Sequence, residues 1–134
     1  MVELHGWITL RETSRVSIDE EENSCVLIEE IISEIDKLSW FKPEVNAQNG
    51  EWFIEFTIFC NRINPQVEEA FRLFEKIGQI AKGSYGLIYL YNDEDTHGKN
   101  NIFQVFSMVR GKIYEKEDPF LSPIIPVLED TDED

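Results

Sequence analysis

The sequence predicts an α+β fold, with two helices packed on one face of a mainly antiparallel sheet. Three observations predict it. Segments that alternate between apolar and polar residues, as strands do, lie near the start, in the middle and after residue 84. Two segments between them carry apolar residues at helical spacing. The resulting order, β-α-β-β-α-β-β, is ferredoxin-like in part and suits one sheet under one helical layer.

The first strand is predicted over Val2–Arg11, with its aliphatic residues on one face and with His5 and Trp7 on the other. The clearest strand is Glu51–Cys60, which follows a short predicted strand over residues 40–45 and an Asn-Gly hairpin signal. Later strands are expected over residues 84–92, 102–109 and 112–114.

Each helix has a start signal and a stop signal. Ser17 and Glu20 have the spacing of a capping box before the first helix, which is expected to end near Ser39. Asn64 is the expected cap of the second helix, with Pro65 at its first position and Gly83 as its stop. The apolar stripes are Leu27, Ile28, Ile31, Ile32, Ile35 and Leu38 in the first helix, and Val67, Ala70, Phe71, Phe74, Ile77 and Ala81 in the second.

The chain has 134 residues, 42% of them hydrophobic, which is enough to bury a core and typical of one domain. We therefore predict a single domain over residues 1–134. Residues 1–114 would form the α+β core. Residues 115–134, with three prolines and eight acidic residues against one lysine, would form an extended arm that packs on the core and frays after Glu129.

The formal net charge is −15, from 12 Lys and Arg against 27 Asp and Glu. Such a chain is repelled by nucleic-acid phosphates and by anionic membranes, so direct binding to either is not expected. The same field would steer a basic protein partner inward. The alternative is that the acidity only keeps the protein soluble.

Cysteine usage indicates a reducing compartment. Cys25 and Cys60 form no C-x-x-C pair, and both lie among apolar residues, so they are interpreted as reduced core thiols. No basic start is followed by an apolar segment, and no apolar run approaches the length of a membrane span. A cytoplasmic protein is therefore expected.

Residue patterns for metal binding or catalysis are weak. Asp93, Asp95 and His97 resemble the opening of a calcium loop, but Gln104 stands where that loop needs a bidentate Glu. Two histidines and two apolar cysteines do not suggest a zinc site. The glycines around Ser84 lead out of a helix into a strand, whereas a phosphate cradle needs the opposite order. No metal, no cofactor and no enzymatic activity are therefore expected.

Trp7 has two interpretations. It either covers the outer face of the sheet or serves as a rigid aromatic anchor in an interface, where Trp contributes strongly to binding. An aromatic outer face needs a cover, and the tail, a dimer mate or a partner could supply it. The residues that would extend this face are Phe53, Phe59, Tyr85, Tyr89 and Tyr91.

Four segments together resemble the immunity protein 7 family of bacterial polymorphic-toxin systems. They are His5-Gly6-Trp7, Glu51-Trp52-Phe53, the run from Gly83 to Tyr89, and Asp118-Pro119-Phe120-Leu121-Ser122-Pro123 with Ile125-Pro126 and Glu129-Asp130. The resemblance covers residues 5–130. Ile124 departs from the family pattern, where a Cys is expected to be common, but both are apolar residues.

The resemblance implies a non-enzymatic protein that binds a cognate toxin domain, often a basic nuclease, and occludes its active surface. It also implies that the motif residues are mainly scaffold: His5, Gly6, Trp7, Trp52, Ser84, Tyr85, Gly86, Asp118, Pro119, Phe120, Ser122 and Pro123. Toxin contacts are expected instead on two acidic runs, Asp19, Glu20, Glu21 and Glu22, and Asp93, Glu94 and Asp95. A monomer or weak homodimer is expected.

Two other functions stay open on the residues alone. A small-ligand sensing or regulatory domain with a ferredoxin-like sheet would need a concave pocket with a few converging polar groups. A hydrolase would rest on the many carboxylates and on His5 beside Trp7.

Overall fold

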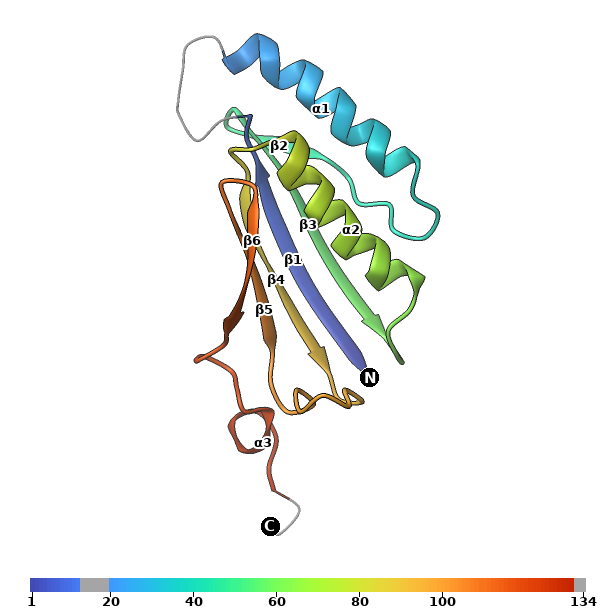
Figure 1. The fold of residues 1–134 in the computed structure, drawn as a ribbon, viewed down its shortest axis with the longest axis vertical. Coiled ribbons are helices and arrows are strands. Elements are labelled where there is room, and N and C mark those ends of the chain that lie inside the picture. The colour runs from blue at the N-terminus through green and yellow to red at the C-terminus, as the bar shows by residue number, and fades with distance from the viewer. Residues whose placement is uncertain (13–19, 132–134) are drawn as a thin grey trace.

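The computed structural model describes residues 1–12 and 20–131, and the side chains of the first helix from Val26 onward. Figure 1 shows a twisted sheet with two long helices on one side and the carboxyl-terminal segment below one end of it. The elements are β1 (Val2–Leu10), α1 (Glu20–Asp36), β2 (Asn46–Gln48), β3 (Glu51–Cys60), α2 (Pro65–Ile80), β4 (Tyr85–Asn92), β5 (Gln104–Val109), β6 (Lys112–Glu117) and α3 (Ile124–Val127).

The six strands lie in the order β2-β3-β1-β4-β5-β6, and each neighbouring pair is antiparallel. The predicted α+β class is confirmed. β1 lies in the middle, between β3 and β4, so the crossover through α2 joins two strands that run in the same direction with β1 between them. This is a split βαβ unit, but the exact ferredoxin-like order is not confirmed.

The strand pairing sorts the side chains onto two faces. On β1, Leu4 lies opposite Ile58 of β3 and Leu90 of β4, and all three are buried beneath the helices. We call this the inner face. His5 and Trp7 point to the opposite side, the outer face, as the alternation of β1 predicts.

Both long helices contribute to one core on the inner face. Ile28, Ile31 and Ile35 of α1 are buried, and so is most of the predicted stripe of α2, including Phe74 at 1% exposed. Ile32, predicted within the stripe of α1, is instead 42% exposed, because it lies at the edge of the helix contact. Leu73 is buried although the stripe does not include it.

The predicted turn and cap residues at the middle of the chain are confirmed. Asn64 caps α2 by accepting a hydrogen bond of 3.0 Å from the Val67 backbone N–H. Asn49 and Gly50 both have positive φ, 51° and 83°, as a tight two-residue hairpin turn requires. The helix itself ends at Ile80 with Ala81 as its cap, so the predicted stop at Gly83 lies two residues beyond the cap.

The short strand expected over residues 40–45 is wrong. The backbone N–H groups of Ser39, Trp40 and Phe41 all donate to the Glu69 carboxylate, so this segment follows the side chain of α2 instead of a neighbouring strand. Lys42 donates to the carbonyls of Ile35 and Asp36, which ends α1 before the predicted Ser39. The strand beside β3 is β2, at Asn46–Gln48.

Two further boundaries differ at the end of the chain. β5 begins at Gln104 and not at residue 102, and β6 continues to Glu117, three residues beyond its predicted end. β6 pairs with β5 along its whole length, which the charged sequence of β6 does not indicate. The arm after β6 is not fully extended, because Ile124–Val127 forms a short helical turn.

The Glu69 carboxylate provides a test of the hydrogen bonds that hold the segment after α1 against α2. Burial would raise its pKa, but backbone hydrogen bonds from Ser39, Trp40 and Phe41, and the charge of Arg72, outweigh burial and lower it. Glu69→Ala leaves three backbone donors without their partner and is expected to lower the melting temperature at pH 7 by several degrees. Glu75→Ala, which removes an exposed carboxylate from the same helix, is the matched control.

The difference between wild type and Glu69→Ala also depends on pH. Since the folded pKa lies below the unfolded value near 4.5, the stabilisation is complete above that value and is lost as the pH falls through the folded pKa. Thermal melts of both proteins from pH 7 down to pH 3 measure the difference in melting temperature. A difference that grows as the pH falls would contradict the assignment.

Candidate partner-binding surfaces

The outer face of the sheet is rich in exposed aromatic side chains. Phe59 is 62% exposed, Trp7 41% and Tyr85 40%, and they come from the adjacent strands β3, β1 and β4. The Trp7 and Tyr85 rings meet edge to face, with their centroids 6.1 Å apart. Exposed aromatic side chains gathered on one face of a sheet are typical of an interaction site.

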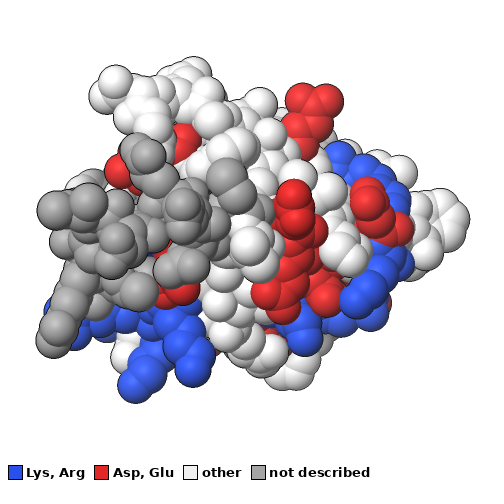
Figure 2. Space-filling model, turned by 90° about the horizontal axis from the view of Figure 1, so that it is seen from above, with Lys and Arg blue, Asp and Glu red and all other residues white. Residues whose placement is uncertain are grey.

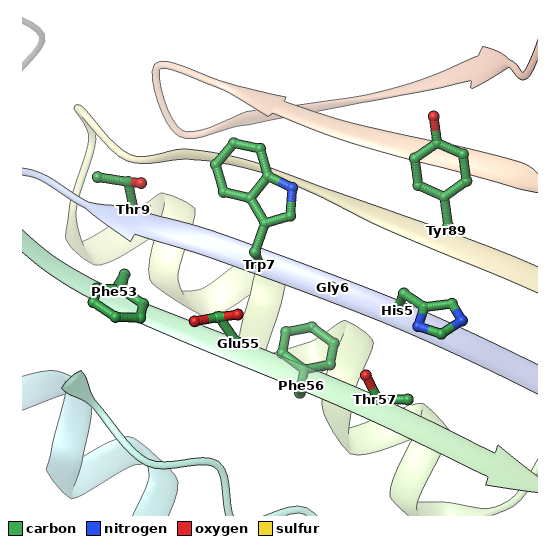
Figure 3. A pocket seen from close by; sticks show the side chains of 9 residues that line it. All are labelled: His5, Gly6, Trp7, Thr9, Phe53, Glu55, Phe56, Thr57 and Tyr89. Atoms are coloured by element: carbon green, nitrogen blue, oxygen red, sulfur yellow. The ribbon is translucent and has the colours of Figure 1, made fainter. Parts of the chain in front are cut away.

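A hollow of about 420 Å³ lies on this face over β1 and β3. Figure 3 shows it from the side away from the helices, with Trp7 standing up from β1 and Glu55 beside it on β3. The hollow is open to solvent along the sheet. Its lining residues are His5, Gly6, Trp7, Thr9, Phe53, Glu55, Phe56, Thr57 and Tyr89.

His5 is held at the edge of the hollow by two contacts. Its Nε2 lies 2.6 Å from Glu3 Oε2, and its ring meets Phe59 edge to face at 5.7 Å. Both partners also belong to the outer face, since Glu3 pairs with Phe59 in the β1–β3 ladder. The carboxylates of this face belong to no sequence motif, although Glu3 and Glu55 alternate with its aromatic residues.

The carboxyl-terminal arm covers only one end of the outer face. Ile124 is 2% exposed and packs with Tyr91 and Phe103. Asn101 exchanges two hydrogen bonds with the Ile125 backbone, at 2.9 and 3.1 Å. Burial, with nearby carboxylates, raises the pKa of Tyr91. The arm is therefore docked at Tyr91, while Trp7 and Phe59 are left exposed.

Asp118 and Ser122 shape the arm where it leaves β6. Asp118 is buried and accepts hydrogen bonds from the backbone N–H groups of Phe120 and Leu121 and from the Ser122 hydroxyl, at 2.8–3.1 Å. Ser122 Oγ in turn accepts from the Phe103 N–H at 2.9 Å. Pro119 and Pro123 lie within this segment, and Phe120 is 74% exposed.

The motif around Ser84 joins three parts of the fold. Ser84 is fully buried, its Oγ accepts from the Arg11 N–H at 3.1 Å, and its carbonyl accepts from the Gly111 N–H at 3.0 Å. Gly86 lies against the backbone of β1, and Gly6 lies under the ring of Phe56. Trp52 packs partly buried against the core from the inner face.

The start of α1, where one acidic run lies, and the loop after β4, where the other lies, are at opposite ends of the sheet. Asp93–Asp95 follow β4 beside the amino terminus, and the Met1 amino group lies 2.5 Å from Asp93 Oδ1. Glu20–Glu22 begin α1 at the other end in Figure 1; Asp19 and the side chains of Glu20–Glu22 lie outside the described residues. β1 separates the two ends by about 30 Å at 3.3 Å per residue.

The carboxylates of the loop after β4 are partly engaged within the loop itself. Asp95 is engaged within its own loop, where it accepts hydrogen bonds from the N–H groups of His97 and Lys99, which lower its pKa. On the end of the molecule seen from above in Figure 2, outside the grey atoms, Lys and Arg side chains gather in two groups with carboxylates between them. The charge of −15 is thus unevenly distributed.

Groupings that would indicate other functions are few in the described part of the chain. Among the side chains of residues 1–12 and 26–131, no three His, Cys, Asp or Glu residues lie together as metal ligands would. Cys60 is a free thiol, partly buried against the core; the Cys25 side chain lies outside the described set. No helix in the described ranges is long and apolar enough to cross a membrane.

The family model described as Immunity protein 7 matches residues 1–130 of the 134. The chain belongs to the immunity protein 7 family. The resemblance drawn from its four motifs is thereby confirmed, and the match includes the sheet, both long helices and the arm. Comparisons with curated proteins and with solved structures found no match.

Membership of the immunity protein 7 family gives the protein an immunity role. Such a role means binding a cognate toxin protein. The surface features above then become candidates for the toxin contact, among them the aromatic outer face of the sheet.

Proposed function

We propose that the protein neutralises a cognate toxin domain in the cytoplasm by covering its active surface, without chemistry of its own. The observation that carries the proposal is the family match over residues 1–130. The open aromatic face supports it, because large exposed aromatic patches suit protein partners. We further propose that the protein acts as a monomer or weak homodimer.

The charge supports a basic toxin, and a nuclease is the basic class that the proposal favours. A protein of net charge −15 attracts a surface built to hold nucleic acid. The hollow on the outer face supports a protein ligand over a small molecule. Small-molecule pockets enclose most of the ligand surface, whereas this hollow is open along the sheet.

Co-expression tests the function directly. A candidate toxin domain, chosen from the genes that neighbour this one, is expressed in a sensitive strain with or without the immunity protein, and growth is followed. Rescue of growth by wild type, together with loss of toxin activity in vitro at a one-to-one ratio, is expected. Persistent toxicity with both proteins folded and present would contradict the proposal.

Charge steering makes a separate prediction for the rate of association. Because salt screens exposed charges, the rate constant for toxin binding is expected to fall at least about tenfold between about 0.05 and 0.5 M salt. Stopped-flow mixing measures this rate. A rate that does not change with salt would contradict steering by charge and leave occlusion intact.

A further inference from the structure

Trp7 and Glu55 stand directly opposite each other in the β1–β3 ladder. Side chains at such positions on one face lie close enough to act on the same ligand group. Trp7 is 41% exposed and Glu55 is exposed. Among the described side chains, those of residues 1–12 and 26–131, the Glu55 carboxylate has neither an ion-pair nor a hydrogen-bond partner, so its charge is available to a partner protein.

The charges around this pair have one sign. The outward positions of β1, β3 and β4 include three carboxylates and no Lys or Arg; the carboxylates are Glu3, Glu51 and Glu55. Glu3 is engaged with His5, which leaves Glu51 and Glu55. The Lys residues of the outer face lie on β6, three strands from β1.

An arginine side chain fits both members of the pair. A guanidinium stacks on an indole ring and binds a carboxylate through its N–H groups, and a lysine ammonium does the same less specifically. The outer face already holds one contact of this kind, since Lys116 Nζ lies 5.6 Å from the centroid of the Tyr114 ring. The outward positions of β1, β3 and β4 thus supply the ring and the carboxylate but no Lys or Arg.

We infer that the hollow between β1 and β3 receives an arginine or lysine side chain of the toxin, stacked on Trp7 and paired with Glu55. This inference rests on the proposed function. It places the centre of the interface on the outer sheet face, between the two acidic runs, and gives the charge of the protein a specific point of contact. His5, Phe59 and Tyr85 then form the surrounding rim.

The binding experiment uses the 134-residue chain and the toxin domain that the co-expression test identifies as its partner. Trp7→Ala is expected to weaken binding about 30-fold or more, as loss of a central aromatic anchor does. Glu55→Gln is expected to weaken it about tenfold and Glu55→Arg further. The matched controls are Trp40→Ala, which removes a 66% exposed Trp at another site, and Glu75→Gln, on α2. Each control is expected to change the affinity less than about threefold.

The toxin side of the contact is tested in the same assay. Each surface Arg and Lys of the toxin is replaced by Ala and measured against wild type and Glu55→Gln. At one toxin position, the substitution is expected to weaken binding to wild type but to have little further effect on binding to Glu55→Gln. Such non-additivity is what a direct contact between two residues produces. Absence of such coupling at every position would overturn the inference.

The outcomes separate the inference from the proposed function. If wild type binds and protects, and Trp7→Ala and Glu55→Arg do so equally well, the inference is wrong and the immunity role stands. If wild type neither binds nor protects, both are wrong. Circular dichroism checks that each variant folds. If Trp7→Ala does not fold, Glu55→Arg, a substitution at an exposed position, provides the test of the inference instead. Sedimentation showing a dimer that Trp7→Ala dissociates would assign this face to a second copy and overturn the inference.

Discussion

Replacing Phe74 with alanine is expected to lower the free energy of unfolding by about 3–5 kcal/mol. Phe74 is 1% exposed and is the largest of the fully buried side chains of the described core. Its ring lies on α2 where the helix packs on the sheet, so its removal leaves a cavity bordered by both layers. Since small domains have only about 5–15 kcal/mol of stability, this one change removes a large part of it.

Phe59→Ala is the matched control for Phe74→Ala. Phe59 is 62% exposed on the outer face, so the same chemical change is expected to alter stability by less than about 0.5 kcal/mol. Urea unfolding followed by circular dichroism measures both variants. Equal losses for the two would mean that the inner face is not the core side of the sheet.

Gly86→Ala is expected to cost about 3 kcal/mol or more, at the upper end of overpacking substitutions. A Cβ at this position would lie 2.1 Å from the Trp7 carbonyl oxygen and 2.8 Å from Ile8 Cα. Both are backbone atoms of β1, so no side-chain rotation can relieve the clash and the β1–β4 pair has to separate. The substitution would therefore disturb the centre of the sheet.

Gly50→Ala separates this clash from the general effect of replacing a glycine. Gly50 has φ +83°, and a Cβ added there would meet no atom within 4 Å, so its substitution carries backbone strain alone, about 1–2 kcal/mol. Chemical denaturation of the two variants side by side measures the difference. A loss in Gly86→Ala no larger than that in Gly50→Ala would show that β1 and β4 are not in close contact at this point.

Much of the fold could be predicted because its signals are local. The alternation of β1 and β3 indicates which side chains share a face, and Asn64 with Pro65 marks the start of α2. The conformation of residues 40–45 could not be predicted, because it depends on backbone hydrogen bonds to the Glu69 side chain. In the sequence, Glu69 has the pattern of an ordinary solvent-exposed residue of a helix. The strand order likewise depends on pairing between distant segments.

The sequence predicts the aromatic character of the candidate site but not which residues lie opposite one another in it. Trp7 and the neighbouring aromatic residues could be assigned to an outer face from their spacing alone, and the pairing of β1, β3 and β4 brings them together. The direct pairing of Trp7 with Glu55 depends on the register of two strands separated by a helix, which spacing does not specify. For the same reason, the spacing of residues does not indicate that Asp93–Asp95 lie at the opposite end of the sheet from the start of α1.

The central place of β1 determines when the folded protein can form during synthesis. Although β1 is the first strand made, it pairs with β3 on one side and with β4 on the other, and Val2 pairs with Asn92. A nascent chain that has not yet released β4 from the ribosome leaves one long edge of β1 unpaired. The sheet can close only after β4 has emerged, so β1 lacks its second neighbour while both long helices and β3 are being made.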